Sequence, residues 1–185
     1  GSVGLTIGGA GNTTISGTIG VGAGALAKDG TGTLTLSGSN SHTGTTTVSN
    51  GTLIVSHSSA LGATTNAITV SSGATLQLSN NITIGANPLS LSGVGYTGAG
   101  GSLVSVGDNI YQGSITLGSD TTINTYSGLF NITGSSKTIS GTNRSLTFIG
   151  AGTLVIDDAI SIGTGSLTQN GAGITYLQNT NTYSG

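Results

Sequence analysis

Short runs in which apolar residues alternate with small polar ones recur along the whole chain. Examples are TLTL at 33–36, TLIV at 52–55 and TLQL at 75–78. A period of two places one set of side chains on a buried face and the other on an exposed, hydroxyl-rich face. The pattern predicts half-buried β-strands at 5–7, 33–36, 52–55, 67–70, 75–78, 82–84, 89–91, 103–106, 115–117, 146–148, 153–156 and 160–162.

Clusters of Gly, Asn and Ser separate these runs, as in SGSN at 37–40 and SNG at 49–51. Such residues supply the positive φ angles that tight corners require. No apolar pattern of the i, i+3, i+4, i+7 type persists for three turns, and 35 of the 185 residues are Gly. We therefore expect essentially no helix.

An internal repeat is the strongest sign of organisation. Residues 5–44 match residues 146–185 without a gap, at an offset of 141. The shared residues are interpreted as corners and core, and changes such as Lys28 to Gln169 and His42 to Tyr183 as surface changes. The second copy stops part-way, so we expect 1–185 to be a single β-helical segment of a longer repeat array. The residues retained in the second copy are Gly9, Ala10, Gly11, Ile15, Ile19, Gly22, Gly24, Leu26, Gly30, Gly32, Leu36, Asn40 and Gly44.

Short strands, glycine corners and repetition without helix favour an all-β solenoid, in which each strand pairs with the turns above and below. With three strands and about 22 to 27 residues per turn, the chain makes roughly seven to eight turns at a spacing of about 4.8 Å. An antiparallel sandwich is the alternative fold. The predicted interior residues are Leu34, Leu36, Val48, Leu53, Val55, Ile68, Val70, Leu76, Leu78, Ile82 and Ile84.

Charge and composition exclude several functions. The net charge of −2 comes from three basic and five acidic residues, which is unsuited to nucleic acid or anionic lipid. There is no Cys and there are only two His, so we predict no disulfide framework, no metal site and no haem or iron–sulfur cofactor. A signal peptide or membrane anchor is expected only outside this segment, and Gly1-Ser2 is equally consistent with an expression scar.

Residues 30–62, GTGTLTLSGSNSHTGTTTVSNGTLIVSHSSALG, resemble the autotransporter-associated β-strand repeat of passenger domains and related giant surface proteins. The family pattern is a glycine-rich entry, TLTLSG, an NTYTG-like corner, TTV, a Gly-Thr-Leu strand and a Leu-Gly close. His42 stands where the family usually has Tyr, and NTNTYSG at 179–185 restores it. The resemblance implies a right-handed parallel β-helix secreted through a C-terminal outer-membrane barrel to the surface of a Gram-negative bacterium. It implies no catalytic residues.

Charged residues offer little chemistry. Asp157-Asp158 is the only carboxylate pair, and neighbours on a strand point to opposite faces, so the two are interpreted as solvated corner residues, with a weak calcium contact as the alternative. Lys28, Lys137 and Arg144 are too few and too separated in sequence for a lyase or hydrolase site. We therefore predict no catalytic, cofactor-binding or metal-ligating residues.

Other candidate residues also have simpler interpretations. His42 and His57 each follow a serine, but neither lies in a nucleophile elbow, so both are predicted to be polar corner residues. Gly9-Ala10-Gly11 lacks the strand-to-helix transition and the Lys of a phosphate loop. Five tyrosines are candidates for sugar stacking, against ordinary packing: Tyr96, Tyr111, Tyr126, Tyr176 and Tyr183.

The sequence thus predicts a non-enzymatic β-helical module of a secreted or surface fibre, acting as a stalk, spacer or adhesin. The alternatives are a carbohydrate-binding or carbohydrate-cleaving β-helix, and an ice-binding solenoid with outward threonines from runs such as 45–47. The irregular middle of the chain argues against an ice-binding array. Expected partners are a second copy stacked end to end or neighbouring repeats of the same polypeptide, with host or surface glycans as a further candidate, and neither nucleic acid nor membrane.

Overall fold

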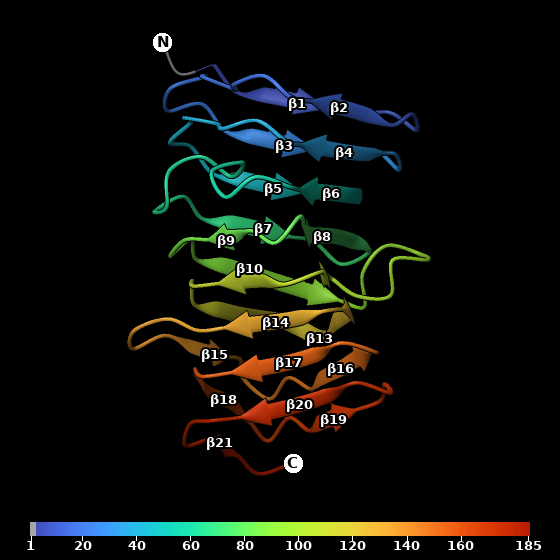
Figure 1. Cartoon of the computed structure of the whole chain (residues 1–185), viewed down its shortest axis with the longest axis vertical. Helices are drawn as coiled ribbons and strands as arrows, with labels where there is room; N and C mark the ends of the chain where they lie inside the picture. The colour runs from blue at the N-terminus through green and yellow to red at the C-terminus, as the bar shows by residue number, and fades with distance from the viewer. Residues whose placement is uncertain (1–2) are drawn as a thin grey trace.

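The computed structural model describes residues 3–185, so Gly1 and Ser2 lie outside the description. The chain forms a parallel β-solenoid in which strands stack along one axis from the N-terminus to the C-terminus (Figure 1). Every strand pairing in residues 3–185 is parallel. The predicted solenoid is confirmed and the sandwich is wrong.

The first face contains one strand from every turn, and we number the levels of the solenoid by these strands. Together they make nine stacked levels. The strands are β1 (Leu5–Ile7), β3 (Leu26–Lys28), β5 (Thr46–Val48), β7 (Ile68–Val70), β10 (Leu89–Gly93), the start of β13 (Ile115–Ser127), β15 (Thr138–Ser140), β18 (Ala159–Gly163) and β21 (Thr182–Tyr183).

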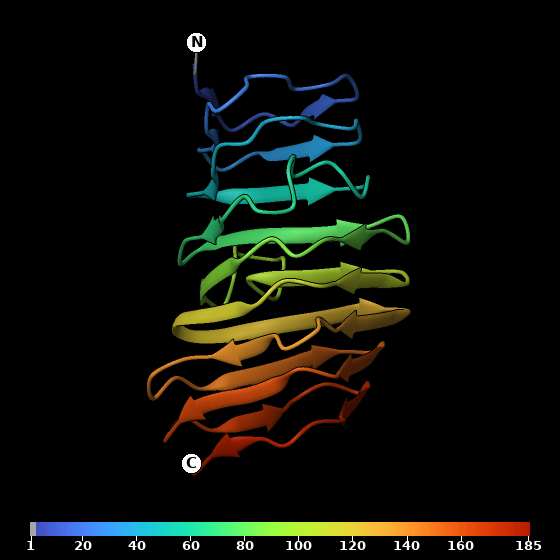
Figure 2. The same ribbon diagram turned by 90° about the vertical axis from the view of Figure 1, so that its left-hand side faces the viewer.

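Two more faces close the turn, as the side view in Figure 2 shows. The second face contains β2 (Thr13–Ile15), β4 (Thr33–Leu36), β6 (Gly51–Val55), β8 (Ala74–Ser79), β11 (Leu103–Val106), the latter part of β13, β16 (Leu146–Gly150) and β19 (Leu167–Gln169). The third face contains β9 (Thr83–Ile84), β12 (Asn109–Tyr111), β14 (Leu129–Ile132), β17 (Thr153–Ile156) and β20 (Ile174–Leu177).

Nine levels exceed the seven to eight that the sequence predicted. The reason is turn length: most turns are shorter than expected, because Leu5 pairs with Leu26, 21 residues on, and Leu26 pairs with Thr46, 20 residues on. Only the fifth turn is long, with Leu89 pairing with Ile115, and the extra residues form the loop between β10 and β11. Eight intervals of about 4.8 Å give a rod about 38 Å long.

The interior of the solenoid is a continuous apolar column. All eleven residues predicted to be interior are buried, and the largest additions are Tyr111, Phe130 and Phe148. The strands missed by the sequence reading are those with weak or no alternation, such as β3, β12 and β14. Parallel neighbours above and below supply their hydrogen bonds, so these segments are strands through pairing more than through pattern.

The two copies of the sequence repeat occupy different faces. Leu5 starts a first-face strand, whereas its counterpart Leu146 starts a second-face strand. An offset of 141 residues therefore equals six turns and one further side of the triangle. Local contacts are nevertheless reproduced: Asn40 Oδ1 accepts the Ile19 N–H at 2.8 Å, and Asn181 Oδ1 accepts the Ile160 N–H at 2.9 Å. The repeat thus specifies a local turn geometry and leaves its position around the axis free.

Candidate binding face

Side chains at the centre of each first-face strand point outward and form a column of hydroxyl groups. From the third level onward each member lies in direct register with the next. The middle of the chain does not interrupt the column, because the loop between β10 and β11 and the register shift after Leu91 both lie beyond the outward residue Ser90. The expectation that the irregular middle breaks such an array is wrong. The column consists of Thr47, Thr69, Ser90, Thr116, Ser140, Ser161 and Thr182.

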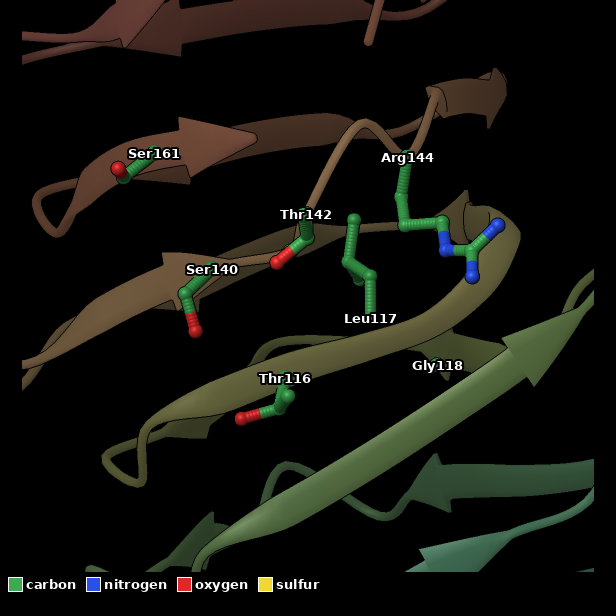
Figure 3. A pocket seen from close by; sticks show the side chains of 8 residues that line it. Thr116, Leu117, Gly118, Ser140, Thr142, Arg144 and Ser161 are labelled. Atoms are coloured by element: carbon green, nitrogen blue, oxygen red, sulfur yellow. The ribbon is translucent and has the colours of Figure 1, made fainter. Parts of the chain in front are cut away.

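The column lines a shallow trough on the outside of the solenoid. A depression of about 490 Å³ is lined by Thr116, Ser140 and Ser161, and Arg144 borders it (Figure 3). A second, of about 130 Å³, shares Thr116 and extends along Ser90 to Thr69. Further down the same face, another of about 420 Å³ is lined by Thr182 and Tyr183. We call this series of depressions along the column the hydroxyl trough.

Hydrogen-bonding capacity and low charge define the chemistry of the hydroxyl trough. Arg144 is the one side chain carrying full charge among the described residues that line the three depressions. Its guanidinium donates hydrogen bonds in a fixed planar geometry. Each hydroxyl both donates and accepts, and the strand spacing sets neighbours about 4.8 Å apart. The trough therefore suits an extended, uncharged, polar ligand.

Threonines of the run at 45–47 do not all face outward. Thr45 is exposed and Thr47 belongs to the column, but Thr46 is fully buried. Its hydroxyl lies 3.1 Å from Nε2 of His42 inside the solenoid. Alternation along β5 dictates this, because Thr46 shares the inward direction with Val48.

His42 and Lys28 are interior residues, so their assignment as surface positions is wrong. Lys28 is 2% exposed, and its Nζ donates to the carbonyls of Asp29, Gly30 and Asn50 at 3.3, 2.7 and 3.2 Å. Burial lowers the pKa of Lys28, and the neighbouring Asp29 carboxylate partly opposes that shift. In the second copy Gln169 binds two equivalent corner carbonyls, those of Gly171 and Gly173. Both side chains serve the corner.

His42 is fully buried, and burial lowers its pKa below the ordinary value. Its Nδ1 has no hydrogen-bond partner among the described residues. Gly62 lies against the ring, since a Cβ there would approach Nδ1 to 2.9 Å. His57, by contrast, is half-buried and accepts the Ser59 N–H through Nδ1 at 3.0 Å, as a polar corner residue should.

His42 is expected to make stability fall with acidity. Its folded-state pKa is lowered, so the unfolded chain binds the proton more readily; stability is complete above about pH 6.5 and decreases as the pH falls below it. The slope for one such group is at most about 1.4 kcal/mol per pH unit. Denaturant unfolding at pH 7.5 and 5.0 measures the effect. His42→Gln should remove most of this dependence while His57→Gln retains it; equal slopes in both variants would contradict the assignment.

Asp158 is not a solvated corner residue, which corrects the expectation for this member of the Asp pair. It is 2% exposed, and its Oδ1 accepts the Gly134 N–H at 2.8 Å. Burial raises its pKa most; the Gly134 hydrogen bond and the Lys137 charge lower it, while Asp157 raises it further. Asp158 Oδ2 and Asp157 Oδ1 are buried without a partner among residues 3–185. No cluster of three or more His, Cys, Asp or Glu occurs within that range.

Asp158→Asn is expected to keep or increase stability at neutral pH. The raised pKa means that ionised Asp158 is less favourable in the folded chain than in the unfolded one, so the penalty applies above the folded-state pKa and vanishes in acid. An asparagine Oδ1 still accepts the Gly134 N–H. Unfolding at pH 7 measures the effect, with Asp157→Asn for comparison. A clear loss of stability in Asp158→Asn would show that the charge is needed.

The tyrosines do not converge on one surface. Tyr111 is buried, its hydroxyl donates to the Asn87 carbonyl at 2.7 Å, and burial raises its pKa. Tyr126 and Tyr176 are exposed, from the second and third faces. Tyr183 alone borders the hydroxyl trough. The five tyrosines therefore form no common stacking platform.

Glycines retained in the repeat are those at which the next turn leaves no room for a side chain. A Cβ at Gly32 would lie 2.1 Å from the Gly11 carbonyl oxygen, and a Cβ at Gly173 would lie 2.1 Å from that of Gly152. Gly9-Ala10-Gly11 belongs to such a corner, between β1 and β2. It positions backbone against backbone, and its role is structural.

Comparison with known proteins gives one match. The family model described as Passenger-associated-transport-repeat matches residues 26–55, from β3 to β6, and residues 167–185, from β19 to the last residue. No curated protein and no solved structure gives a significant match. The matched segments are the two copies in which the asparagine bond and the glycine contacts recur. Within residues 3–185, no helix has the length and apolar character needed to cross a membrane.

Proposed function

The chain carries passenger-associated transport repeats of the kind found in autotransporter passengers, and on this premise we propose that it is a non-catalytic shaft of a secreted, surface-exposed protein. Its role is to hold a distal part of that protein away from the surface of a Gram-negative cell. The observation that carries the proposal is the first face, in which nine strands pair in sequence without interruption. Stacked turns over one apolar column give a rod whose length grows with every repeat.

Removing a whole turn tests the shaft proposal in the parent protein. Thr46 pairs with Ile68, so deletion of residues 46–67 brings Ile68 onto Leu26 and preserves every register. We expect this variant to reach the cell surface, resist protease and keep the parent's adhesion within about twofold. Deletion of residues 46–56, about half a turn, should abolish protease resistance, because it brings interior residues to the surface. A displayed, protease-resistant whole-turn variant without adhesion would overturn the proposal and indicate a specific site in that turn.

The hydroxyl trough favours a second candidate function, the binding of an uncharged glycan chain along the axis. The in-register hydroxyls offer repeated donors and acceptors, and Arg144 supplies a fixed donor at the edge. Thr116→Lys with Ser140→Lys would obstruct the trough. Loss of binding on an array of neutral glycans in this variant supports the second function, and absence of binding by the wild type rejects it. Ice binding, which needs a flat array, is tested by thermal hysteresis of the same two proteins.

End-to-end association with another copy is the partner that the end surfaces favour for the isolated chain. Ile174, Tyr176 and Leu177 on β20 are 56%, 50% and 36% exposed, and Val3 is 73% exposed at the opposite end. Open strand edges beside apolar side chains recruit other strands.

We expect the isolated chain to form larger species as its concentration rises, measured by light scattering. Lysines at Thr180 and Thr182, both exposed, should suppress this by repulsion without lowering the melting temperature. Serines at the same positions are the matched control. A wild-type chain that stays monomeric at high concentration would contradict the prediction.

A further inference from the structure

Five asparagines occur in the sequence Asn-x-Ser/Thr, which is the acceptor motif for N-linked sugars. Their side chains behave differently from those of the other nine asparagines. In residues 3–185, none of the five donates a hydrogen bond through Nδ2, whereas eight of the other nine do. Nδ2 is the atom that receives the sugar, so the motif coincides with an unengaged acceptor nitrogen. The five are Asn12, Asn50, Asn81, Asn131 and Asn143.

Three of the five are also exposed and lie at corners: Asn12, Asn81 and Asn143. Each already uses Oδ1 to accept a backbone N–H from the following turn. A sugar on Nδ2 leaves this carbonyl in place, so the inter-turn bond survives the modification. The donors are the N–H groups of Thr33 to Asn12 at 3.0 Å, Asp108 to Asn81 at 2.9 Å and Thr164 to Asn143 at 3.1 Å.

Asparagines outside the motif include five that have no space for a sugar. Asn40, Asn66, Asn87, Asn109 and Asn124 are 1–6% exposed, and each gives an Nδ2 hydrogen to a backbone carbonyl. A sugar on any of them would displace that bond and require the turns to separate. Asn50 and Asn131 complete the motif but are only half-buried, so they are left out of the proposal below.

We propose that Asn12, Asn81 and Asn143 are acceptor sites for N-linked glycosylation. The amide nitrogen attacks the anomeric carbon of a sugar activated as a glycosyl diphosphate. The new C–N bond replaces the sugar–phosphate bond, the diphosphate-bearing group leaves with the electron pair, and one amide proton passes to a base of the transferase. The activating group is a nucleotide or a lipid, and the chemistry at asparagine is the same for both.

Placement of the three sites suits a shaft. They lie on the first, fourth and seventh levels, so successive sugars are about 14 Å apart along the axis. Sugars at corners project away from the sheets and add hydrophilic bulk to a wall with few charges, which opposes lateral association of shafts. This inference does not depend on whether the chain is a shaft or a glycan-binding module.

The test is peptide mapping by mass spectrometry of the parent protein secreted by its own cells. We expect sugar on the peptides containing Asn12, Asn81 and Asn143. A single hexose would indicate a nucleotide-activated donor and a preassembled oligosaccharide a lipid-linked one. Thr14→Ala, Thr83→Ala and Ser145→Ala remove the motif one site at a time but keep each asparagine and its inter-turn bond, so each should abolish one modification. Unmodified peptides at all three sites in the wild type would overturn the proposal.

A created motif provides the matched control. Tyr126→Thr makes Asn124-Thr-Thr, and Tyr126 is 64% exposed, so the substitution itself is tolerated. Asn124 is 6% exposed and donates to the Ala99 carbonyl at 3.4 Å. We expect Asn124 to be unmodified in secreted protein, or its modification to lower the melting temperature, whereas sugars at the three proposed sites leave it unchanged. Full modification of Asn124 without loss of stability would refute the argument from the free Nδ2.

Discussion

Leu36→Asp is expected to unfold the solenoid around β4. Leu36 is fully buried, with Ile15 and Val55 as its register partners on the turns to either side. The substitution loses the burial of the leucine and places a carboxylate in an apolar column with no partner, which together should cost about 4 kcal/mol or more. Denaturant unfolding of wild type and variant measures the difference. A cost near zero would mean that the interior of the solenoid is not where the alternation places it.

Thr35→Asp is the matched control, since it introduces the same carboxylate one residue away. Thr35 is half-buried and points outward between Thr14 and Ile54, so the cost should be about 1 kcal/mol or less. Equal costs at the two positions would show that the register is wrong by one residue.

Leu177, the repeat counterpart of Leu36, provides an internal comparison and corrects one expectation. The sequence predicted that both leucines point into a buried interior, but Leu177 is 36% exposed because β20 is the edge strand of the third face. Leu177→Asp should therefore cost much less than Leu36→Asp. Identical sequence context gives different burial here, because only one of the two leucines has a turn on both sides.

Alternation was sufficient to predict the interior because its residues are aliphatic. It failed at Lys28 and His42, where a polar residue takes the inward position and finds its partners on backbone carbonyls or a buried threonine. No sequence rule marks these two as interior, since their partners come from other residues of the turn or from the next one. Register between turns was also inaccessible: the hydroxyl column depends on Thr69, Ser90 and Thr116 aligning across turns of unequal length.

The N-glycosylation motif shows the complementary case. The tripeptide is visible in the sequence at both Asn50 and Asn143, and only the structure shows that the first is half-buried and the second exposed. A local motif thus becomes a site through its surroundings. The same holds for the glycines, whose requirement depends on what the next turn places opposite them.

Gly32→Ala is expected to destabilise the fold through a clash between turns. The added Cβ would lie 2.1 Å from the Gly11 carbonyl oxygen and 2.8 Å from its carbon, and a backbone neighbour cannot rotate away as a side chain can. The φ of Gly32 is not positive, so the cost comes from crowding and not from backbone conformation. Forcing adjacent turns apart also weakens the Gly32 N–H bond to the Gly9 carbonyl, now 3.0 Å. We expect a loss of about 3 kcal/mol in unfolding free energy.

Gly11→Ala isolates that cause. Gly11 is the residue opposite Gly32 on the preceding turn, and a Cβ there meets nothing within 4 Å. The substitution should change stability by about 0.5 kcal/mol or less, in either direction. Denaturant unfolding of the two single variants gives the comparison, and Gly173→Ala tests the second copy, where a Cβ would lie 2.1 Å from the Gly152 carbonyl oxygen. If Gly32→Ala were as stable as Gly11→Ala, the turns would be less closely spaced than the parallel pairing of β2 with β4 requires, and close backbone contact would no longer explain why the repeat keeps these glycines.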